Sequence, residues 1–325
     1  MTFLKPVVTD KNLERTRSRV RGQLEGSSID MPNAVFKWVL RLTLSFCLAV
    51  LVTLLAMVIT GSYPLFMERA GSFLANGYTS KSATRGVFQG LRGTFWIGIC
   101  VVGFAFPVGI SAAVYLEEYA SNNWFNRLIN VNIRNLAGVP SVVYGLLGLA
   151  VFVELLDGVA GVPSKTLGQT TIAGGLTLAV LSLPVVIITA SEAIRAVPTP
   201  LRQAAYGVGA TKSQVIRSHI LPHAAPGIFT GSLLALARAL GEAAPLIVVG
   251  AVSSRLGSST GLFDPSQLGE KFTAMPMVIT AFVGQPGEQW RPLASAAIVV
   301  LLVVVLGFNV VAVLLRNRFE GKREG

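Results

Sequence analysis

Two side chains of opposite charge, Arg238 and Glu242, stand inside a long apolar segment. Their four-residue spacing puts them on one face of a helix. A charged side chain in the middle of a membrane costs about 2.5–3.5 kcal/mol on insertion scales, so two of them indicate a use beyond packing. The forked guanidinium group of arginine matches the oxygens of phosphate-like anions. The pair therefore predicts a path for an anion, and a purely structural salt bridge between helices is the alternative.

The same predicted helical face carries small or helix-bending residues, namely Gly231, Ala235 and Pro245. We expect these residues to leave room for an ion and to allow a bend. Glu242 is then expected to hold Arg238 when no anion is bound and to compete with a bound one, so that release stays easy.

The composition indicates the kind of element that must hold this pair. Of 325 residues, 52% are hydrophobic and only 13% are charged, whereas soluble domains carry about 25% charged residues. A helix that spans a membrane needs roughly 20 mainly apolar residues. Six runs of this kind predict an all-α polytopic membrane protein with six transmembrane helices, over residues 35–60, 95–116, 136–156, 170–190, 228–252 and 293–315.

The distribution of Lys and Arg predicts the orientation. Taken together, the segments before the first span and after the second, fourth and sixth hold more of these residues than the other loops, which predicts that both termini lie in the cytoplasm. The membrane is expected to be the plasma (inner) membrane. We expect a basic, disordered cytoplasmic tail over residues 1–33, a membrane domain over 34–316 with a cytoplasmic loop at 195–226, and a cytoplasmic tail at 317–325. The net charge of +11 then requires no nucleic acid partner, while anionic membrane lipid is expected beside the basic tail.

The loop between the fourth and fifth spans contains helix signals of its own. Thr199 and Pro200 suit the start of a helix, and Gly207 and Gly209 suit its end. The run Thr211-Lys212-Ser213-Gln214 fits a capping box that opens a second helix. We expect Pro222, Pro226 and Gly227 to close this element before the fifth span. Two capped helices exceed what a simple connector needs, so the loop predicts a docking surface for a partner.

Other charged residues lie near predicted span ends. Glu192 and Arg195 are candidate gate residues, with an ion pair at the membrane interface as the alternative. Glu117 and Glu118 are expected to be a solvated helix end.

Some of the remaining features point to packing. Gly138, Ser141, Gly145 and Gly148 recur at helical spacing, which favours close packing of helices over the alternative of a pore lining. Met275–Val283 is apolar but too short to span, and is predicted to be a short helix at the membrane interface.

The loop also resembles a known motif. Permeases of ATP-binding-cassette importers carry Glu-Ala-Ala, three residues, Gly, nine residues, Ile, one residue and Leu-Pro. This chain has Gln203-Ala204-Ala205, Gly209 and His219-Ile220-Leu221-Pro222 at the same spacing, with Gln203 and His219 as departures. The resemblance implies an ATPase-docking loop made by Leu201, Gln203, Ala204, Ala205, Gly209, Leu221 and Pro222.

Three further segments, residues 113–119, 136–146 and 237–246, resemble the PstA-type permeases of phosphate importers, and the likeness covers residues 35–316. It implies the type I, MetI-like architecture and ATP-driven import of inorganic phosphate along a path that includes Arg238 and Glu242. The implied partners are a homologous PstC-like permease, a PstB-like ATPase dimer and a PstS-like extracytoplasmic phosphate-binding protein.

The chain shows no Gly-rich phosphate loop, catalytic triad or metal-ligand spacing. It is therefore expected to be a non-enzymatic subunit with no catalytic residues, no metal and no cofactor of its own, with ATP and Mg²⁺ held by the partner ATPase. Three alternatives stay open. They are a permease for sulfate or molybdate, an ion-coupled secondary transporter or channel, for which inverted repeats would be expected, and a scaffold that relays phosphate status to a sensor.

Overall fold

The computed structural model describes residues 31–79, 81–121, 123–157, 167–252 and 261–320, together with positions 14 and 17. The chain divides into two compact units, Met1–Met57 and Val58–Gly325. Throughout the described residues the regular structure is helical, which confirms the all-α class. The predicted disorder of the N-terminal tail falls almost entirely outside these residues and stays a prediction.

The described part of the first unit consists mainly of the beginning of helix α2 (Met31–Ala75). Its large apolar side chains, such as Leu44 and Phe46, are exposed. A helix that is apolar all round suits a lipid environment or a contact with another membrane protein. Towards its end α2 is interrupted at Arg69, whose backbone angles (φ −153°, ψ 38°) are not helical.

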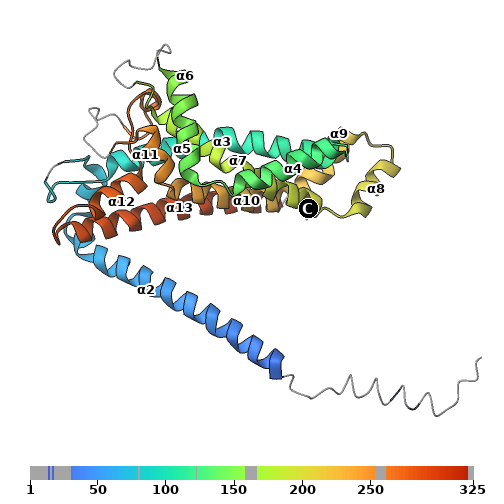
Figure 1. The fold of residues 1–325 in the computed structure, drawn as a ribbon, viewed down its shortest axis with the longest axis horizontal. Helices are drawn as coiled ribbons and strands as arrows, with labels where there is room; N and C mark the ends of the chain where they lie inside the picture. The colour runs from blue at the N-terminus through green and yellow to red at the C-terminus, as the bar shows by residue number, and fades with distance from the viewer. Residues whose placement is uncertain are drawn as a thin grey trace, which may run out of the picture. The chain divides into compact units, whose positions relative to one another are not determined.

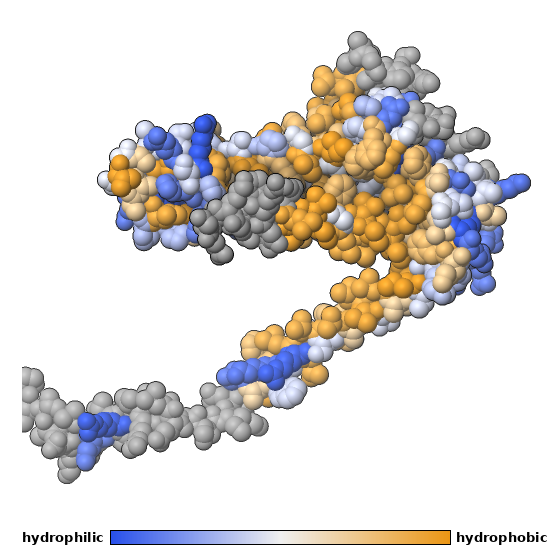
Figure 2. All heavy atoms as spheres, turned by 180° about the vertical axis from the view of Figure 1, so that it is seen from behind, coloured by the Kyte–Doolittle hydropathy of each residue, from blue (hydrophilic) through white to orange (hydrophobic). Residues whose placement is uncertain are grey.

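The second unit is built on four long helices that run side by side (Figure 1): α3 (Phe88–Val114), α7 (Thr171–Arg195), α10 (Leu221–Gly241) and α13 (Trp290–Glu320). Buried apolar side chains from three of them, including Val101, Leu178 and Leu236, form a common core cluster. In Figure 2 hydrophobic residues cover the middle of this unit on the face shown, and hydrophilic residues gather towards its ends. This banding is typical of a helical membrane domain.

Among the described residues, five helices are long and apolar enough to span a membrane, and a sixth span exists if a bent pair is counted as one. The five are Asn33–Ala75, Phe88–Tyr119, Thr171–Arg195, Lys212–Gly241 and Trp290–Val311. The predicted set of apolar segments is therefore recovered, although two of the predicted spans have a different construction.

The predicted third span is wrong at its beginning. Helix α4 (Trp124–Ala137) ends there, and the chain turns through 101° before α5 (Ser141–Gly148), the π-helical turn η2 (Leu149–Val153) and α6 (Glu154–Leu156). The break falls at residues 138–140. Pro140 has no N–H to continue the helix and an extended ψ of 136°, so the apolar run cannot be one straight helix.

The predicted fifth span is wrong at both ends. One helix runs from Lys212 to Gly241 as α9 (Lys212–Val215), the π-helical turn η4 (Ile216–Ile220) and α10. Pro222 and Pro226 therefore do not close the loop. Pro222 lies in the first turn of α10, directly after the π-helical turn η4. The wider backbone hydrogen-bond pattern of that turn accommodates a residue that has no N–H, so the proline does not end the helix.

The helix then ends at Glu242, where the backbone is extended (φ −81°, ψ 119°), and α11 (Ala244–Val249) follows. Gly250 closes α11 with a φ of +100°, a conformation that favours glycine. A short 3₁₀ helix, η5 (Pro265–Gly269), precedes the last two helices.

The short apolar helix predicted at Met275–Val283 is present as α12. It is buried rather than laid on a surface, since Met275, Val278 and Phe282 join Trp290 and Leu293 of α13 in a core cluster. Its position relative to a membrane interface stays a prediction.

The predicted stripe of small residues is split by the bend. Gly138 caps the end of α4 and Ser141 opens α5, whereas Gly145 and Gly148 lie within α5. A Cβ atom at Gly145 would lie 2.8 Å from the Cα atom of Pro245, and one at Gly148 would lie 2.1 Å from the Thr177 hydroxyl oxygen. At these two positions close helix packing explains the glycine.

Candidate functional site: a charged pair at a helix break and a docking helix

Arg238 and Glu242 form a pair at the break between α10 and α11. Arg238 lies in the last turn of α10, Glu242 is the C-cap residue, and the Arg238 Nε and Glu242 Oε1 atoms are 3.6 Å apart. The side chains are 55% and 24% exposed, respectively. The contact expected from the four-residue spacing is present. It lies at the end of a helix and not in the middle of a continuous one. We call these two residues the path pair, after the anion path that the sequence predicts for them.

The expected room for an ion beside Gly231 and Ala235 is absent. Both are buried, and a Cβ atom at Gly231 would lie 2.3 Å from the Thr189 side chain of α7. Pro245 is also buried, against Gly145. The small residues of this helix therefore serve packing, while the guanidinium of Arg238 faces out of this chain's core. An anion would reach Arg238 from that exposed side.

The contact within the path pair is loose. A hydrogen bond from nitrogen to oxygen normally measures about 2.7–3.2 Å, so 3.6 Å is an electrostatic contact rather than a well-formed bond. A guanidinium group has five donor hydrogens, and a single carboxylate oxygen at this distance leaves most of them available. The geometry suits an arginine that exchanges its carboxylate partner for an incoming anion.

The second candidate region is the helix α8 (Thr199–Gly207), which stands apart from the long helices at one end of the second unit (Figure 1). The helix begins at Thr199, one residue earlier than predicted, with Pro198 as its N-cap, and it ends at Gly207 as expected. Gly209 then adopts a φ of +85°, which explains the glycine there.

The predicted capping box at the start of α9 is confirmed. The Thr211 hydroxyl oxygen accepts a hydrogen bond from the backbone N–H of Gln214 at 3.4 Å. The side-chain oxygen of Gln214 accepts one from the backbone N–H of Thr211 at 2.8 Å. These bonds satisfy two backbone groups that would otherwise be unpaired at a helix start. The loop thus consists of one short helix, a glycine turn and the start of the long helix that leads to Arg238.

Helix α8 has two distinct faces. Leu201 and Arg202 are half-buried and Ala205 is buried, so this face is directed at the bundle. The other face is exposed, and Val208 just beyond it is 86% exposed; we call this the outer face of α8, made by Gln203, Ala204, Tyr206 and Val208. Of the other residues predicted to dock, Gly209 and Pro222 are exposed and Leu221 is half-buried. Exposed apolar side chains of this kind are typical of a surface that another protein covers.

Beside α8 lies a group of four charged side chains, which we call the charge cluster: Glu117, Glu118, Arg195 and Arg202. The two acids lie in the π-helical turn η1 (Tyr115–Tyr119) that continues α3. Their side chains are only 14% and 6% exposed, so the prediction of a solvated helix end is wrong.

The first half of the charge cluster joins α7 to η1. The Arg195 guanidinium donates to Glu117 through Nη2 at 2.7 Å and through Nε at 3.3 Å. The ion-pair partner of Arg195 is thus on another helix, while Glu192 is exposed. The two candidate gate residues, Glu192 and Arg195, therefore do not form an ion pair with each other at this end of α7.

The second half of the charge cluster joins three elements. Arg202 of α8 donates through Nη1 to Glu118 and through Nη2 to the backbone carbonyl of Ile194 at 2.7 Å. One side chain of α8 thus holds both the end of α3 and the end of α7. A planar guanidinium suits this arrangement because its donors point in fixed directions.

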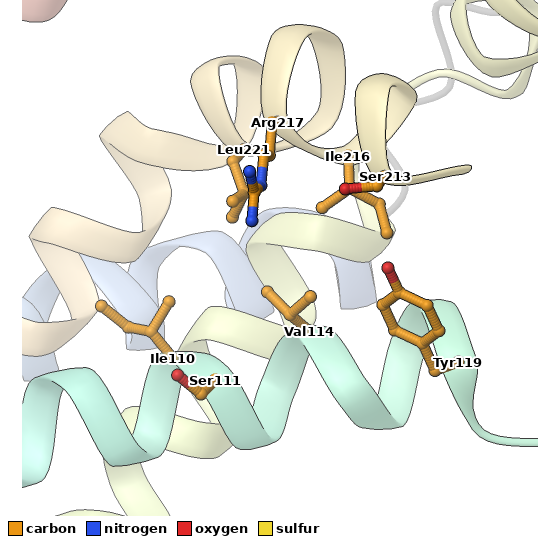
Figure 3. A pocket seen from close by; sticks show the side chains of 8 residues that line it. All are labelled: Ile110, Ser111, Val114, Tyr119, Ser213, Ile216, Arg217 and Leu221. Carbon is orange, nitrogen blue, oxygen red and sulfur yellow. The ribbon is translucent and has the colours of Figure 1, made fainter. Parts of the chain in front are cut away.

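A pocket of about 300 Å³ lies between α3 with η1 and the helix that starts at α9 (Figure 3). In Figure 3, Arg217 and Leu221 project into it from the helix that starts at α9, opposite side chains of α3 and η1. Lys212 lies near the rim, with its Nζ atom 5.0 Å from the ring centre of Tyr119. The pocket is lined by Ile110, Ser111, Val114, Tyr119, Ser213, Ile216, Arg217 and Leu221, and the path pair has no part in it.

Several of these residues escaped prediction from the sequence. The partners of Arg195 and Arg202 lie 78 and 84 positions away along the chain, so no local spacing points to them. The sequence offered one signal for these ion pairs: two adjacent acids, Glu117 and Glu118, end an apolar span on the side where the basic loop is also expected. In the described part of the chain, no group of three or more His, Cys, Asp or Glu side chains could hold a metal ion.

Comparison with known proteins connects these features to a family. Residues 105–323 match the family described as binding-protein-dependent transport system inner membrane component. Phosphate transport system permease protein PstA of Mycobacterium leprae is 31% identical over 268 residues, which cover 82% of this chain and 83% of that protein. PstC of Haemophilus influenzae is 32% identical over 244 residues, covering 69% and 76%.

Two relatives from Bacillus subtilis are matched over shorter stretches. The probable ABC transporter permease proteins YqgH and YqgI are 35% and 33% identical, and the chain spans 59% and 56% of their lengths. Among solved structures, the inward-facing MetNI methionine ABC transporter aligns with a TM-score of 0.51 at 18% identity, covering 72% of this chain and 94% of that one. This similarity concerns the fold.

Proposed function

Because this chain belongs to the family of binding-protein-dependent transport system inner membrane components, we propose that it is the permease subunit of an ATP-driven importer of inorganic phosphate. The names of the relatives support the substrate, since phosphate transport permeases of both the PstA and PstC types are about one-third identical to it. The three segments that resemble PstA-type permeases favour that type.

The observation that carries the proposal is the placement of Arg238. Its guanidinium is exposed at a helix break and loosely paired with Glu242. A path for an anion between two permeases requires donors that face out of each chain. A second, PstC-like permease would supply the opposite wall of the path. Phosphate would displace Glu242 from Arg238, and the carboxylate would take its place again on release.

The proposed partners would meet the second unit at its two ends. The outer face of α8 would dock on a PstB-like ATPase dimer, which would hold ATP and Mg²⁺, and this end would lie in the cytoplasm with both chain termini. A PstS-like binding protein would deliver phosphate at the opposite side of the plasma membrane. ATP binding would draw the ATPases together and move α8, and the permease itself would carry out no chemistry.

Reconstitution tests this function. The chain, a PstC-like permease and the ATPase are placed in liposomes with the binding protein, and uptake of labelled phosphate is measured with and without ATP. We expect uptake that requires ATP and stops when the ATPase carries an inactivating substitution in its ATP site. Excess unlabelled phosphate should compete, and sulfate and molybdate should not.

Two results would contradict the proposal. Phosphate uptake that persists with the inactive ATPase would favour an ion-coupled transporter or channel. ATP-dependent uptake of sulfate or molybdate in preference to phosphate would assign a different oxyanion.

A further inference from the structure

Arg202 makes two contacts in different directions, and both leave its own helix. One reaches Glu118 in the π-helical turn η1 and the other reaches the carbonyl of Ile194 near the end of α7. The Glu118 side chain is 6% exposed and that of Arg202 is 22% exposed, so solvent screens this contact little. Charge-assisted hydrogen bonds of this kind are among the strongest that side chains form.

Two adjacent acids in the π-helical turn η1 serve two different partners. Consecutive residues of an α-helix point about 100° apart, so Glu117 and Glu118 would normally serve different sides. A π-helical turn inserts a residue and alters these directions, and such turns are frequent at functional sites. Here Glu117 binds Arg195 at the end of α7, while Glu118 binds Arg202 on α8.

The other connections of α8 to the bundle are apolar. Leu201 and Ala205 pack in the core cluster at this end, whose buried members include Ile194, Val215 and Ile216. Apolar contacts are not directional, so they hold the helix against the bundle without determining how it transmits a sideways or rotating movement. Beyond α8, which ends at Gly207, the chain passes through Val208 and Gly209, the latter with a positive φ, before α9.

We propose that Arg202 is the positioning residue that transmits movement of the docking helix α8 to the ends of α3 and α7. The inference rests on the proposed function, because it says how a movement imposed on α8 reaches the membrane helices. The two helix ends that Arg202 contacts, those of α3 and α7, belong to helices that extend into the bundle. α3 and α7 pack along each other, and α7 packs against α10, which carries Arg238 in its last turn.

A matched pair of substitutions tests the role of Arg202. Arg202→Gln removes the charge and the fork and leaves a shorter polar side chain. Arg217→Gln makes the same change at an exposed arginine on the adjacent η4, which forms no ion pair among the described residues. The reconstituted importer is used, and phosphate taken up per ATP hydrolysed is measured alongside assembly and ATP hydrolysis.

We expect Arg202→Gln to keep assembly and ATP hydrolysis, since Leu201, Ala205 and the outer face of α8 are unchanged. Phosphate uptake per ATP should fall about tenfold, the usual scale for losing a hydrogen-bonded charged contact. Arg217→Gln should keep the ratio of the unmodified complex. Glu118→Gln added to Arg202→Gln should cost little more, because residues that act through one contact are not additive.

An unchanged ratio in Arg202→Gln, or an equal fall in Arg217→Gln, would overturn the proposal. If Arg202→Gln fails to assemble, Arg202→Lys decides, because lysine keeps the charge near Glu118 but cannot reproduce the fork that also binds Ile194. A reduced ratio in Arg202→Lys supports the proposal, and an unchanged ratio rejects it.

Hydrogen exchange separates this inference from the proposed cargo. ATP binding to the unmodified complex should change amide exchange in both α8 and η1. In Arg202→Gln the change should persist in α8 and be lost in η1, whatever the complex transports. A change that persists in both elements would reject the role of Arg202 even if phosphate import is established, and absence of phosphate uptake by the unmodified complex would reject only the proposed cargo.

Discussion

The path pair and the charge cluster use the same residue types, yet they are constructed differently. The path pair is a single loose contact, largely open to the outside of this chain, between neighbours on one helix end. The two carboxylates of the charge cluster are shielded, at 14% and 6% exposure, although Arg195 is 61% exposed; the cluster contains shorter hydrogen bonds and joins elements that are far apart in the sequence. A loose pair open to the outside suits exchange of partners, whereas shorter bonds to shielded carboxylates suit transmission of force. The two regions therefore fit binding and coupling, respectively.

Removing the arginine of the path pair is expected to have the largest effect on transport. Arg238→Ala should reduce phosphate uptake by about 10- to 100-fold, the scale of a hydrogen bond to a charged group. Arg238→Lys should also lose most uptake, because an ammonium group lacks the fork. Complex assembly should remain, since Arg238 is exposed in this chain.

The control for Arg238 is Arg127→Ala, at an exposed position of α4. Uptake by this variant should match that of the unmodified importer. Normal uptake by both Arg238 variants would contradict the path assignment.

Removing one acid from each region should lower the stability of the protein by different amounts. Glu118→Ala leaves Arg202 partly buried without its partner, and we expect the free energy of unfolding to fall by about 1–3 kcal/mol. This lies below the 3–5 kcal/mol typical of a fully buried pair, because Arg202 keeps some exposure. Glu242→Ala should change it by less than about 1 kcal/mol, as for other exposed pairs.

The measurement for these two acids is denaturation of the purified chain in detergent. Equal losses for Glu118→Ala and Glu242→Ala would show that the two regions do not differ in the way described.

A methyl group added beside the break between α10 and α11 should destabilise the packing near the path pair and leave α8 unaffected. Gly145→Ala places its Cβ atom 2.8 Å from the backbone of Pro245, in the helix that follows Glu242. Overpacking of this kind costs about 1–3 kcal/mol. Thermal unfolding should show this loss, while hydrogen exchange in α8 should be unchanged.

The matched control is Gly103→Ala, since no atom within 4 Å would meet its Cβ in this chain. It should be neutral or slightly stabilising, because alanine is the better helix former. A tolerated Gly145→Ala would mean that α11 moves freely, and the rigid geometry of the break would have to be revised.

The smallest expected effect concerns the helix start beside the charge cluster. Thr211→Ala removes the capping box and should cost about 1 kcal/mol. Amide exchange at Ser213 and Gln214 should accelerate, while exchange near Arg238 should not. Thr230→Ala, at an exposed hydroxyl within α10, is the control and should leave exchange at α9 unchanged. Acceleration that extends to Arg238 would show that the two regions are not independent.

Features that depend on local patterns could be predicted from the sequence. The apolar runs, the capping box at Thr211 and the short helix at Met275–Val283 are all present. The contact between Arg238 and Glu242 is present as well, because four-residue spacing brings side chains together even at a helix end. These features each follow from helical periodicity or from the chemistry of a few neighbouring residues.

Features that depend on distant contacts could not be predicted. Apolar character does not reveal where a run bends, so the break after Ala137 was missed, and the bend expected at Pro245 is a full break three residues earlier, at Glu242. Small residues beside Arg238 suggested room for an ion, although the Thr189 side chain occupies the space at Gly231. A stripe of small residues is compatible with either a cavity or a packed neighbour, and only the neighbour's position distinguishes them.

The sequence by itself determined the class of the protein, its apolar segments, and the presence near one another in the chain of an arginine within an apolar run and a helix-forming polar loop. Only the tertiary structure decided which face of α8 is free, which acids hold Arg195 and Arg202, and towards which side Arg238 is open. The reason is physical: periodicity and capping act between residues a few positions apart, whereas burial and ion pairing depend on how separate helices pack.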